Sequence, residues 1–474
     1  MIKIYNSLSS QKEEFKPLIQ GEVKMYVCGP TVYDVSHLGH LRAAYVFDVI
    51  RRYLEYRDFK VTFVRNITDI DDKIINRARE ELQAGEDLHQ KVKDVAEKYT
   101  LLYEEDMTSF GIKEPDAQPR ATKHIPDMIK MIQILIDKGA AYEAGGDVYF
   151  AVREFEEYGK LSHQSIDQMM DGVRKTQETN KKDPLDFALW KKAKPEEPFW
   201  ESPWGKGRPG WHIECSVMSK EHLSLPFDIH GGGRDLIFPH HENEIAQAEA
   251  ATGKPFANFW IHNGLLTVEK EKMAKSLGNF ITIKEILDKY HPDVLKIFFL
   301  QAHYASTTDF SWEKMEESKK AYERLERLKE KLEKNYSIQD ENDIIKGGAG
   351  NIAEYKAAFV VAMDDDFNTA KALAVFFDMV YECNKLIESE EKNKELILAY
   401  ALRVMIEMSE VFGLTFLKQK TKISEKEIKE RINLRSQFKK DKKYKEADAL
   451  RDELLNLGVV LEDIKDGTTI WRIS

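Results

Sequence analysis

The sequence has few cysteines and no long apolar run. Only three cysteines, Cys28, Cys215 and Cys383, occur in 474 residues, and their wide spacing excludes the disulfide framework of a small secreted domain. No segment approaches the roughly 18 consecutive apolar residues of a membrane helix. Residues 1–15 lack the apolar core of a secretory signal. We therefore expect a cytoplasmic protein without a membrane segment.

The composition is that of a folded protein with several domains. Hydrophobic residues make up 42% and aromatic residues 11%, which is enough for packed cores and excludes general disorder. The length of 474 residues suggests about three domains. A net charge of -11 argues weakly against nucleic acid as a partner, but residues 418–451 contain 13 Lys and Arg against 6 Asp and Glu, a local charge of +7. Charge alone does not distinguish a solvated helical face from a contact with phosphates.

The N-terminal region predicts a parallel sheet. Residues 23–28 and 60–64 have the composition of strands, whereas residues 41–54 carry apolar side chains at helical spacing. Strand, helix and strand in so short a segment form a βαβ unit, whose two strands lie parallel. Ligands of such sheets bind beyond the carboxyl ends of the strands, which is where Cys28 falls.

The pattern changes twice after this unit. An insertion interrupts the sheet and contains a predicted helix at 129–138 and a predicted strand at 147–150. The sheet pattern resumes with a strand at 227–230 and a helix at 242–252. Beyond Asp309, apolar residues at helical spacing predict a bundle. The helices expected there are residues 315–332, 352–363, 370–386 and 395–410. A basic linker then leads to a last small unit.

His37 and His40 are the first candidate functional residues. The two imidazoles lie three residues apart where a helix is expected to begin, and Gly39 between them allows a flat ring to approach the backbone. The helix N-terminus adds free N–H groups and partial positive charge, so the place suits a polyphosphate. So short a string also occurs by chance, and a purely structural helix start remains open.

Lys272, Lys275 and Ser276 form the second candidate group, in a charged stretch between Gly264 and Gly278. Alone they are typical of an exposed lysine-rich loop. Together with the histidine pair on the first βαβ unit, they resemble the plan of the class I aminoacyl-tRNA synthetases. In those enzymes the two motifs bind ATP from opposite sides.

Cys28, Cys215, His240 and Glu244 could hold a metal ion. His240 and Glu244 stand at i and i+4, which projects both side chains from one helix face, and two thiolates, an imidazole and a carboxylate make a plausible zinc site. The ligands are dispersed, however, and no Cys-x-x-Cys pair occurs. Spacing alone therefore leaves open buried structural cysteines beside a solvated His–Glu face, and it does not choose between His240 and His241.

Longer strings resemble the cysteinyl-tRNA synthetase family over essentially the whole chain. The matching strings are residues 25–34, 37–40, 66–73, 210–216, 228–233, 238–244, 272–276, 363–369, 447–454, 461–463 and 467–472. In that family the residues matching Cys28, Cys215, His240 and Glu244 hold one zinc ion, so the resemblance selects His240. Two departures are Leu38 in place of Ile and Ala274 in place of Ser. Both lysines and the second serine of the later motif remain, so we expect its phosphate contacts to survive.

The resemblance implies a fold class and a division of the chain. The fold is α/β: a Rossmann-like parallel-sheet catalytic domain with an insertion, then an α-helical bundle and a small C-terminal anticodon-binding domain. The expected segments are the two halves of the catalytic domain at 1–126 and 206–264, the connective insertion at 127–205, the lysine loop and stem-contact region at 265–312, the tRNA-binding bundle at 313–415, and the anticodon-binding unit at 416–474. Trp471 is expected either to stack on a base or to pack in a small core.

The resemblance also implies a two-step ligase reaction. L-Cysteine and ATP, with Mg²⁺, give cysteinyl-adenylate and pyrophosphate, and the acyl group then passes to the terminal ribose of tRNA(Cys). The first step needs positioned groups that stabilise negative charge, and no general base, because the attacking group is a carboxylate. We expect His37, His40, Lys272 and Lys275 to act as catalytic, ATP-binding residues, and Ser276 to bind ATP as well.

Selection of cysteine against serine requires more than shape, because an apolar pocket rejects such a near-isostere only about 10²-fold. Zinc prefers thiolate sulfur to a neutral hydroxyl. We therefore expect the sulfur of the substrate to bind the zinc directly, with Cys28, Trp211 and His212 at the substrate pocket. Ordinary packing is the alternative for Trp211 and His212.

Three other functions stay open from the sequence. A cysteine ligase acting on an amino sugar would share about the first 310 residues but would lack a developed anticodon domain. A simple nucleotidyltransferase would not need the dispersed thiols or the lysine loop. A non-catalytic zinc protein that binds RNA would be expected to lose the His37 or Lys275 motif, and both are present. The aspartates of residues 66–73 could contact substrate or Mg²⁺, or could start a helix. We expect a monomer.

Overall fold

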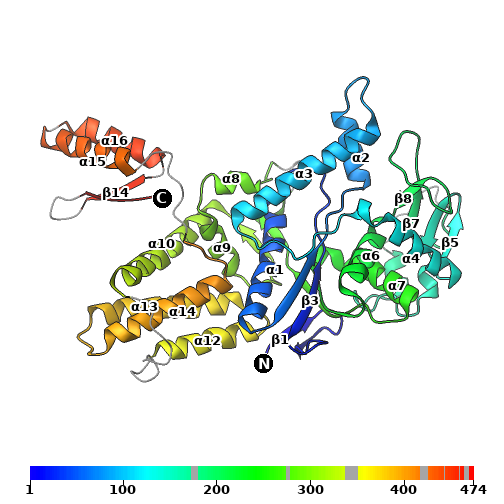
Figure 1. Cartoon of the computed structure of the whole chain (residues 1–474), viewed down its shortest axis with the longest axis horizontal. Helices are drawn as coiled ribbons and strands as arrows, with labels where there is room; N and C mark the ends of the chain where they lie inside the picture. The colour runs from blue at the N-terminus through cyan, green and yellow to red at the C-terminus, as the bar shows by residue number, and fades with distance from the viewer. Residues whose placement is uncertain are drawn as a thin grey trace.

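A four-stranded parallel sheet organises the catalytic part of the chain (Figure 1). The computed structural model describes residues 1–171, 180–273, 278–336, 351–416, 425–441, 443–457, 459–463 and 469–473. The strands, in spatial order, are β10 (Ala257–Asn263), β9 (Phe227–Gly233), β3 (Glu22–Val27) and β4 (Lys60–Arg65). Met25 lies opposite Phe63 on one side and Ile229 on the other. The sheet interior is therefore buried and apolar, as expected for parallel strands covered on both faces.

The order of the strands reverses between β3 and β9. The chain runs from β3 through α1 (Leu38–Tyr56) to β4 on one side, and later returns to place β9 and β10 on the other. Just after the end of β3, the Cys28 N–H donates to the carbonyl of Gly231 in β9 at 3.1 Å. The crevice outside such a switch point is where open α/β sheets bind ligands. Two helices from the second half of the domain border it, namely α6 (Trp211–Leu223) and α7 (Glu242–Thr252).

The insertion is more regular than the sequence predicts. It holds α4 (Ile125–Asp137), α5 (Ile166–Asp171) and a four-stranded antiparallel sheet. The strands of this sheet are β5 (Ala141–Ala144), β6 (Asp147–Phe150), β7 (Phe187–Lys192) and β8 (Gly207–Pro209). Only β6 was predicted, because β5 and β8 are short and β7 ends in lysines, which hides the alternation of apolar and polar side chains.

Two of the three aspartates of residues 66–73 start a helix, whereas Asp69 accepts from the Thr122 N–H at 2.9 Å and from its hydroxyl. Asp71 caps α2 (Asp72–Glu81) by accepting from the Lys73 N–H at 2.9 Å. Asp72 in the first turn pairs with Lys191 at 2.9 Å and with Arg208, so it ties α2 to the antiparallel sheet of the insertion. These contacts agree with the capping interpretation. The next helix, α3 (Leu88–Phe110), packs against α2.

Short elements connect the catalytic domain to the helical bundle. They are the hairpin β1 (Lys3–Asn6) and β2 (Gln11–Glu14), the strands β11 (Leu266–Val268), β12 (Glu271–Lys272) and β13 (Thr308–Phe310), and the helices α8 (Ile283–Leu287) and α9 (Pro292–Leu300). None of the helices in the part of the chain that the structure describes combines the length and hydropathy needed to cross a membrane.

The helical bundle follows the predicted periodicity closely. Its helices are α10 (Trp312–Asn335), α12 (Ile352–Asp364), α13 (Thr369–Glu388) and α14 (Lys394–Val411). Each begins and ends within a few residues of its expected bounds, because an apolar stripe faces the other helices. Cys383 is fully buried in α13 and is a packing residue, as expected.

The C-terminal unit corrects one expectation. Most of the basic segment is helical rather than a linker, and in Figure 1 the unit is set apart from the bundle. Its elements are α15 (Glu425–Lys440), α16 (Tyr444–Asn456) and the antiparallel pair β14 (Val459–Asp463) and β15 (Thr469–Ile473). They enclose a small core of Ile428, Ile432, Leu454, Val459 and Leu461, against which the partly buried Trp471 packs. This contact favours the packing interpretation of Trp471.

A buried ion pair fastens the end of the bundle to α9. Asp293 accepts from the Lys296 ammonium at 2.9 Å, and from the backbone N–H groups of Thr415 at 2.9 Å and Phe416 at 2.8 Å. The Lys296 ammonium also donates to the Gly413 carbonyl at 2.7 Å. Both charged side chains are almost completely buried, so the opposite charge of each offsets the desolvation cost of the other.

Asp293→Ala is expected to lower the free energy of unfolding by about 3–5 kcal/mol, because it leaves the Lys296 charge buried and unpaired. Asp127→Ala is the matched control: Asp127 and Lys130 form an i, i+3 pair of the same spacing at 3.0 Å, but on the surface. That substitution should cost about 0–1 kcal/mol. Urea unfolding followed by circular dichroism measures both, and equal costs would contradict the role of burial.

Candidate active site and metal centre

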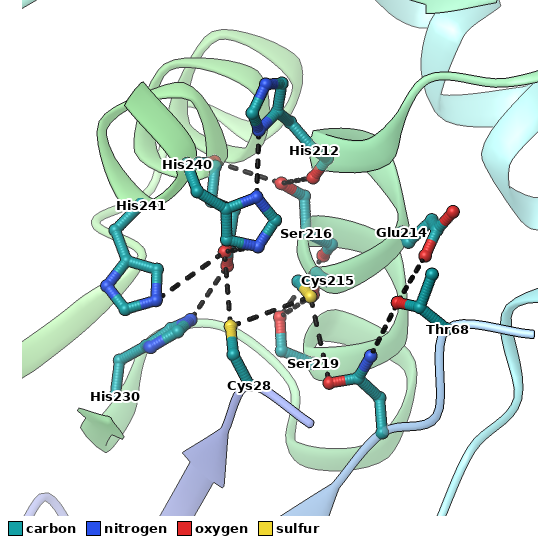
Figure 2. Close-up of polar contacts among 12 residues, drawn as sticks. Cys28, Thr68, His212, Glu214, Cys215, Ser216, Ser219, His230, His240 and His241 are labelled. Atoms are coloured by element: carbon teal, nitrogen blue, oxygen red, sulfur yellow. Dashed lines mark hydrogen bonds and ion pairs between the residues drawn. The ribbon is translucent and has the colours of Figure 1, made fainter. Parts of the chain in front are cut away.

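Four side chains named from the sequence meet beyond the carboxyl end of β3. Figure 2 labels three of them, Cys28, Cys215 and His240. Cys28 follows β3, Cys215 lies in α6, and His240 and Glu244 lie in the turn before α7 and in its first turn. The Cys28 sulfur is 3.7 Å from the Cys215 sulfur and 3.4 Å from Glu244 Oε1. His240 Nε2 is 2.9 Å from the same carboxylate oxygen. One donor atom from each residue lies within 4.8 Å of the other three, close enough to share one ion.

Burial and mutual contact shift the pKa values in this cluster. The hydrogen bond with Cys28 lowers the pKa of the Cys215 thiol to about 7, whereas burial raises the pKa of Cys28. Burial opposes charge on Glu244, yet the neighbouring imidazoles of His230 and His240 lower its pKa well below the usual range. The cluster thus gathers two soft sulfur donors and a carboxylate in a buried place, an environment that favours a bound cation.

The described residues contain a second group of potential metal ligands, which shares Cys28 and Glu244 with the first. Cys28, His230, His241 and Glu244 also place one donor each within 4.8 Å of one another. His230 Nε2 lies 2.8 Å from Glu244 Oε2, and His241 Nε2 is buried with no hydrogen-bond partner in the described structure. Geometry alone therefore permits two ligand sets. Sequence reasoning missed His230. Its place as a polar residue near the end of a buried strand could have indicated a ligand-site residue, because ligands bind at such strand ends.

Asn66 is a second residue that the sequence did not single out. Its Oδ1 accepts from the Gly29 N–H at 2.8 Å and lies 3.8 Å from the Cys215 sulfur. A Cβ added at position 29 would lie only 1.6 Å from the Asn66 carbonyl oxygen. Gly29 is therefore required for the chain after Cys28 to pass this close to Asn66.

Trp211 and His212 flank His240 at the start of α6. The Trp211 indole stacks on the His240 imidazole with ring centroids 3.9 Å apart, and the tryptophan remains 37% exposed. His212 Nδ1 lies 2.9 Å from His240 Nδ1. Burial lowers the pKa of His212 well below its usual value. The structure thus places both residues beside the cluster. Among the four clustered side chains, His240 is the one that the His212 ring contacts in the described structure.

His37 and His40 form the N-terminal cap of α1. His37 Nδ1 accepts from the Gly39 N–H at 3.0 Å, while His40 Nδ1 accepts from the His37 N–H at 3.4 Å, and the two rings stack at 3.8 Å. Burial lowers the pKa of both rings, for His40 to about 3. Because each Nδ1 accepts, the single proton of each neutral ring resides on Nε2. Each Nε2–H is therefore available as a donor to a ligand at the start of the helix.

The predicted lysine loop lies mostly outside the described residues. Lys275 and Ser276 fall in the segment 274–277, and for Lys272 the structure describes only the backbone at the end of β12. The chain after the loop lies against the histidine pair: the Leu38 N–H donates to the Ile281 carbonyl at 3.3 Å, and the Phe280 ring meets His37 edge-on at 5.3 Å.

Curated relatives match this chain along its full length. The cysteine–tRNA ligase of Sulfurihydrogenibium sp. is 50% identical over 99% of each chain, and that of Caldicellulosiruptor saccharolyticus is 48% identical over 100% of each. The chain belongs to the cysteine–tRNA ligase family. Three family models agree: "tRNA synthetases class I (C) catalytic domain" at residues 14–320, "DALR domain" at 358–417, and "Cysteinyl-tRNA ligase anticodon binding domain" at 433–472.

A solved structure of a class I enzyme shares the fold of this cysteine–tRNA ligase family member. Mycobacterium tuberculosis methionyl-tRNA synthetase in complex with methionyl-adenylate superposes with a TM-score of 0.58 at 14% identity, covering 83% of this chain and 90% of that chain. The predicted family and the predicted α/β fold class are confirmed.

Gly29→Ala is expected to reduce cysteine-dependent pyrophosphate exchange by about 10²-fold or more, because a misplacement of about 1 Å can cost that much in rate. The new Cβ overlaps the Asn66 carbonyl, so the backbone must move and carry Cys28 with it. Gly253→Ala, at the end of α7 with φ +70 and open space around it, is the control: it adds strain without approaching the cluster. Equal activity of both variants would contradict the requirement at position 29.

Proposed function

We propose that this chain ligates L-cysteine to tRNA(Cys) with ATP, through cysteinyl-adenylate. Full-length similarity to cysteine–tRNA ligases supports the reaction. The proposal that cysteine is the amino acid substrate rests on one observation, the buried cluster of Cys28, Cys215, His240 and Glu244 beside the switch point. The segment boundaries given from the sequence remain part of this proposal.

One zinc ion per chain is proposed to be held by Cys28, Cys215, His240 and Glu244. Two thiols, an imidazole and a carboxylate converging on a buried point fit zinc, whose protein ligands are of these types. His230 holds the second carboxylate oxygen of Glu244 and so leaves the first for the ion. Zinc, when bound, supplies a soft Lewis acid that prefers the sulfur of cysteine to the hydroxyl of serine. Trp211 and His212 are proposed to border the same pocket.

His37 and His40 are proposed to donate from Nε2 to the phosphates of ATP. Both rings are pre-oriented by the backbone N–H groups that their Nδ1 atoms accept, so they require little reorganisation when negative charge develops on the α-phosphate. Lys272, Lys275 and Ser276 are proposed to bind the leaving pyrophosphate. Mg²⁺ is proposed to accompany ATP.

Transfer RNA, rather than an amino sugar, is the proposed acceptor. The match of residues 433–472 to an anticodon binding domain favours this choice, because a ligase acting on an amino sugar has no use for such a unit. The basic segment 418–451 supplies positive charge for phosphate contacts, and these would fix position rather than sequence.

The purified full-length protein is expected to exchange pyrophosphate into ATP with L-cysteine, and well over about 10²-fold more slowly with L-serine, since the metal adds discrimination to what pocket shape gives. Addition of tRNA(Cys) should give charged tRNA, and an amino sugar should not react. Chelation of the metal should abolish the preference and zinc should restore it. Activation of serine within tenfold of cysteine by the zinc-loaded protein would refute the metal-based selection.

His37→Asn should separate capping from catalysis. The Asn amide oxygen replaces Nδ1 as the cap, so thermal unfolding should match that of the unsubstituted protein, whereas loss of the Nε2–H donor should lower pyrophosphate exchange by about 10²-fold. His37→Ala removes both functions and should also cost about 1 kcal/mol of stability. Full exchange activity in His37→Asn would show that the Nε2–H does not assist the reaction.

A further inference from the structure

The His240 imidazole is engaged at both nitrogens. Its Nε2 faces the ligand cluster, 2.9 Å from Glu244 Oε1. Its Nδ1 lies 2.9 Å from Nδ1 of His212, and Figure 2 shows His212 on the far side of the His240 ring from Cys28. In the described structure, the His212 ring therefore contacts His240 and none of the other three clustered side chains.

A hydrogen bond between two Nδ1 atoms fixes the position of a proton. One ring must carry the proton on Nδ1, and the other must offer a lone pair there. A neutral imidazole that ligates a metal through Nε2 uses the lone pair of that nitrogen, so its one proton must reside on Nδ1. If His240 is the ligand, it donates from Nδ1, and His212 accepts with its own proton on Nε2. The opposite arrangement would put the His240 proton on Nε2 and block ligation.

The surroundings hold the His212 ring in place for this contact. His212 belongs to the first turn of α6, whose N-cap is Gly210. The Phe187 ring, from β7 of the insertion, meets the His212 ring edge-on at 5.6 Å and an interplanar angle of 83°. A residue of the insertion sheet thus packs against a ring that contacts the proposed metal ligand.

We propose that His212 is a positioning residue of the metal centre, accepting the Nδ1–H of His240 and so presenting the Nε2 lone pair of His240 to the ion. This rests on the zinc centre proposed above. Partners of this kind orient ligating histidines, and their loss typically costs 10–100-fold in metal affinity. The role of His212 is then distinct from contact with the substrate.

The test compares two variants of nearly equal shape. His212→Asn places its amide oxygen close to the former Nδ1 and keeps an acceptor, whereas His212→Leu has the same branching and no acceptor. Zinc affinity of the full-length protein is measured by competition with a chromophoric chelator. The dissociation constant is expected to rise about 10–100-fold in His212→Leu and to stay close to the unsubstituted value in His212→Asn.

Two further variants keep the result interpretable. His212→Gln carries its oxygen at the former Nε2 position, so it should weaken binding as Leu does while remaining polar. His222→Leu, an exposed histidine in the last turn of the same helix, should leave zinc affinity unchanged. Equal affinity of the Asn and Leu variants, whether weakened or not, would overturn the role of His212. Absence of zinc binding in the unsubstituted protein would instead refute the proposed metal centre itself.

Discussion

The contact between the ends of β3 and β9 determines where chemistry can occur in this molecule. The hydrogen bond from the Cys28 N–H to Gly231 continues the pairing of β3 with β9 at the point where the strand order reverses. Side chains far apart in sequence, such as Cys28 and Cys215 at a separation of 187 residues, then meet in one cluster. Among the described residues, none of the donors of the cluster comes from the helical bundle, the insertion or the C-terminal unit.

Regular periodicity made part of this fold predictable. The helix at 242–252 and the strand at 147–150 have the bounds expected from the sequence, since each carries a clear pattern. The helices of the C-terminal unit were missed because charges separate the few apolar residues, and their core is small. His230 had a usable signal in its place near the end of a buried strand, but its partner could not be assigned from the sequence, because that depends on the pairing of β9 with β3, which sets His230 opposite Tyr26. Asn66 likewise gains its role only when the chain after β4 meets Gly29. The ligand set likewise needed the family resemblance to separate His240 from His241.

Hydrogen bonds at Nδ1 orient three of the candidate functional histidines, His37, His40 and His240. At the start of α1, backbone N–H groups occupy Nδ1 of His37 and His40, and the opposite nitrogen of each ring becomes the donor. Beside α6 a neighbouring imidazole occupies Nδ1 of His240, and the opposite nitrogen faces the cluster. In the proposed sites the same side chain type thus serves phosphate and metal chemistry, and the local partner decides which end of the ring carries the proton.

The donors of the cluster lie just after β3, in α6, and in the turn before α7 and its first turn, and these elements pack on one large apolar core. Small zinc domains need the ion in order to fold, because little else holds them together. Here the scaffold is stabilised by its own interior, and the pocket can exist only after distant strands have paired. Folding would therefore precede loading of the proposed zinc centre, so during metal scarcity the chain would persist as an intact but inactive stock that zinc can still fill.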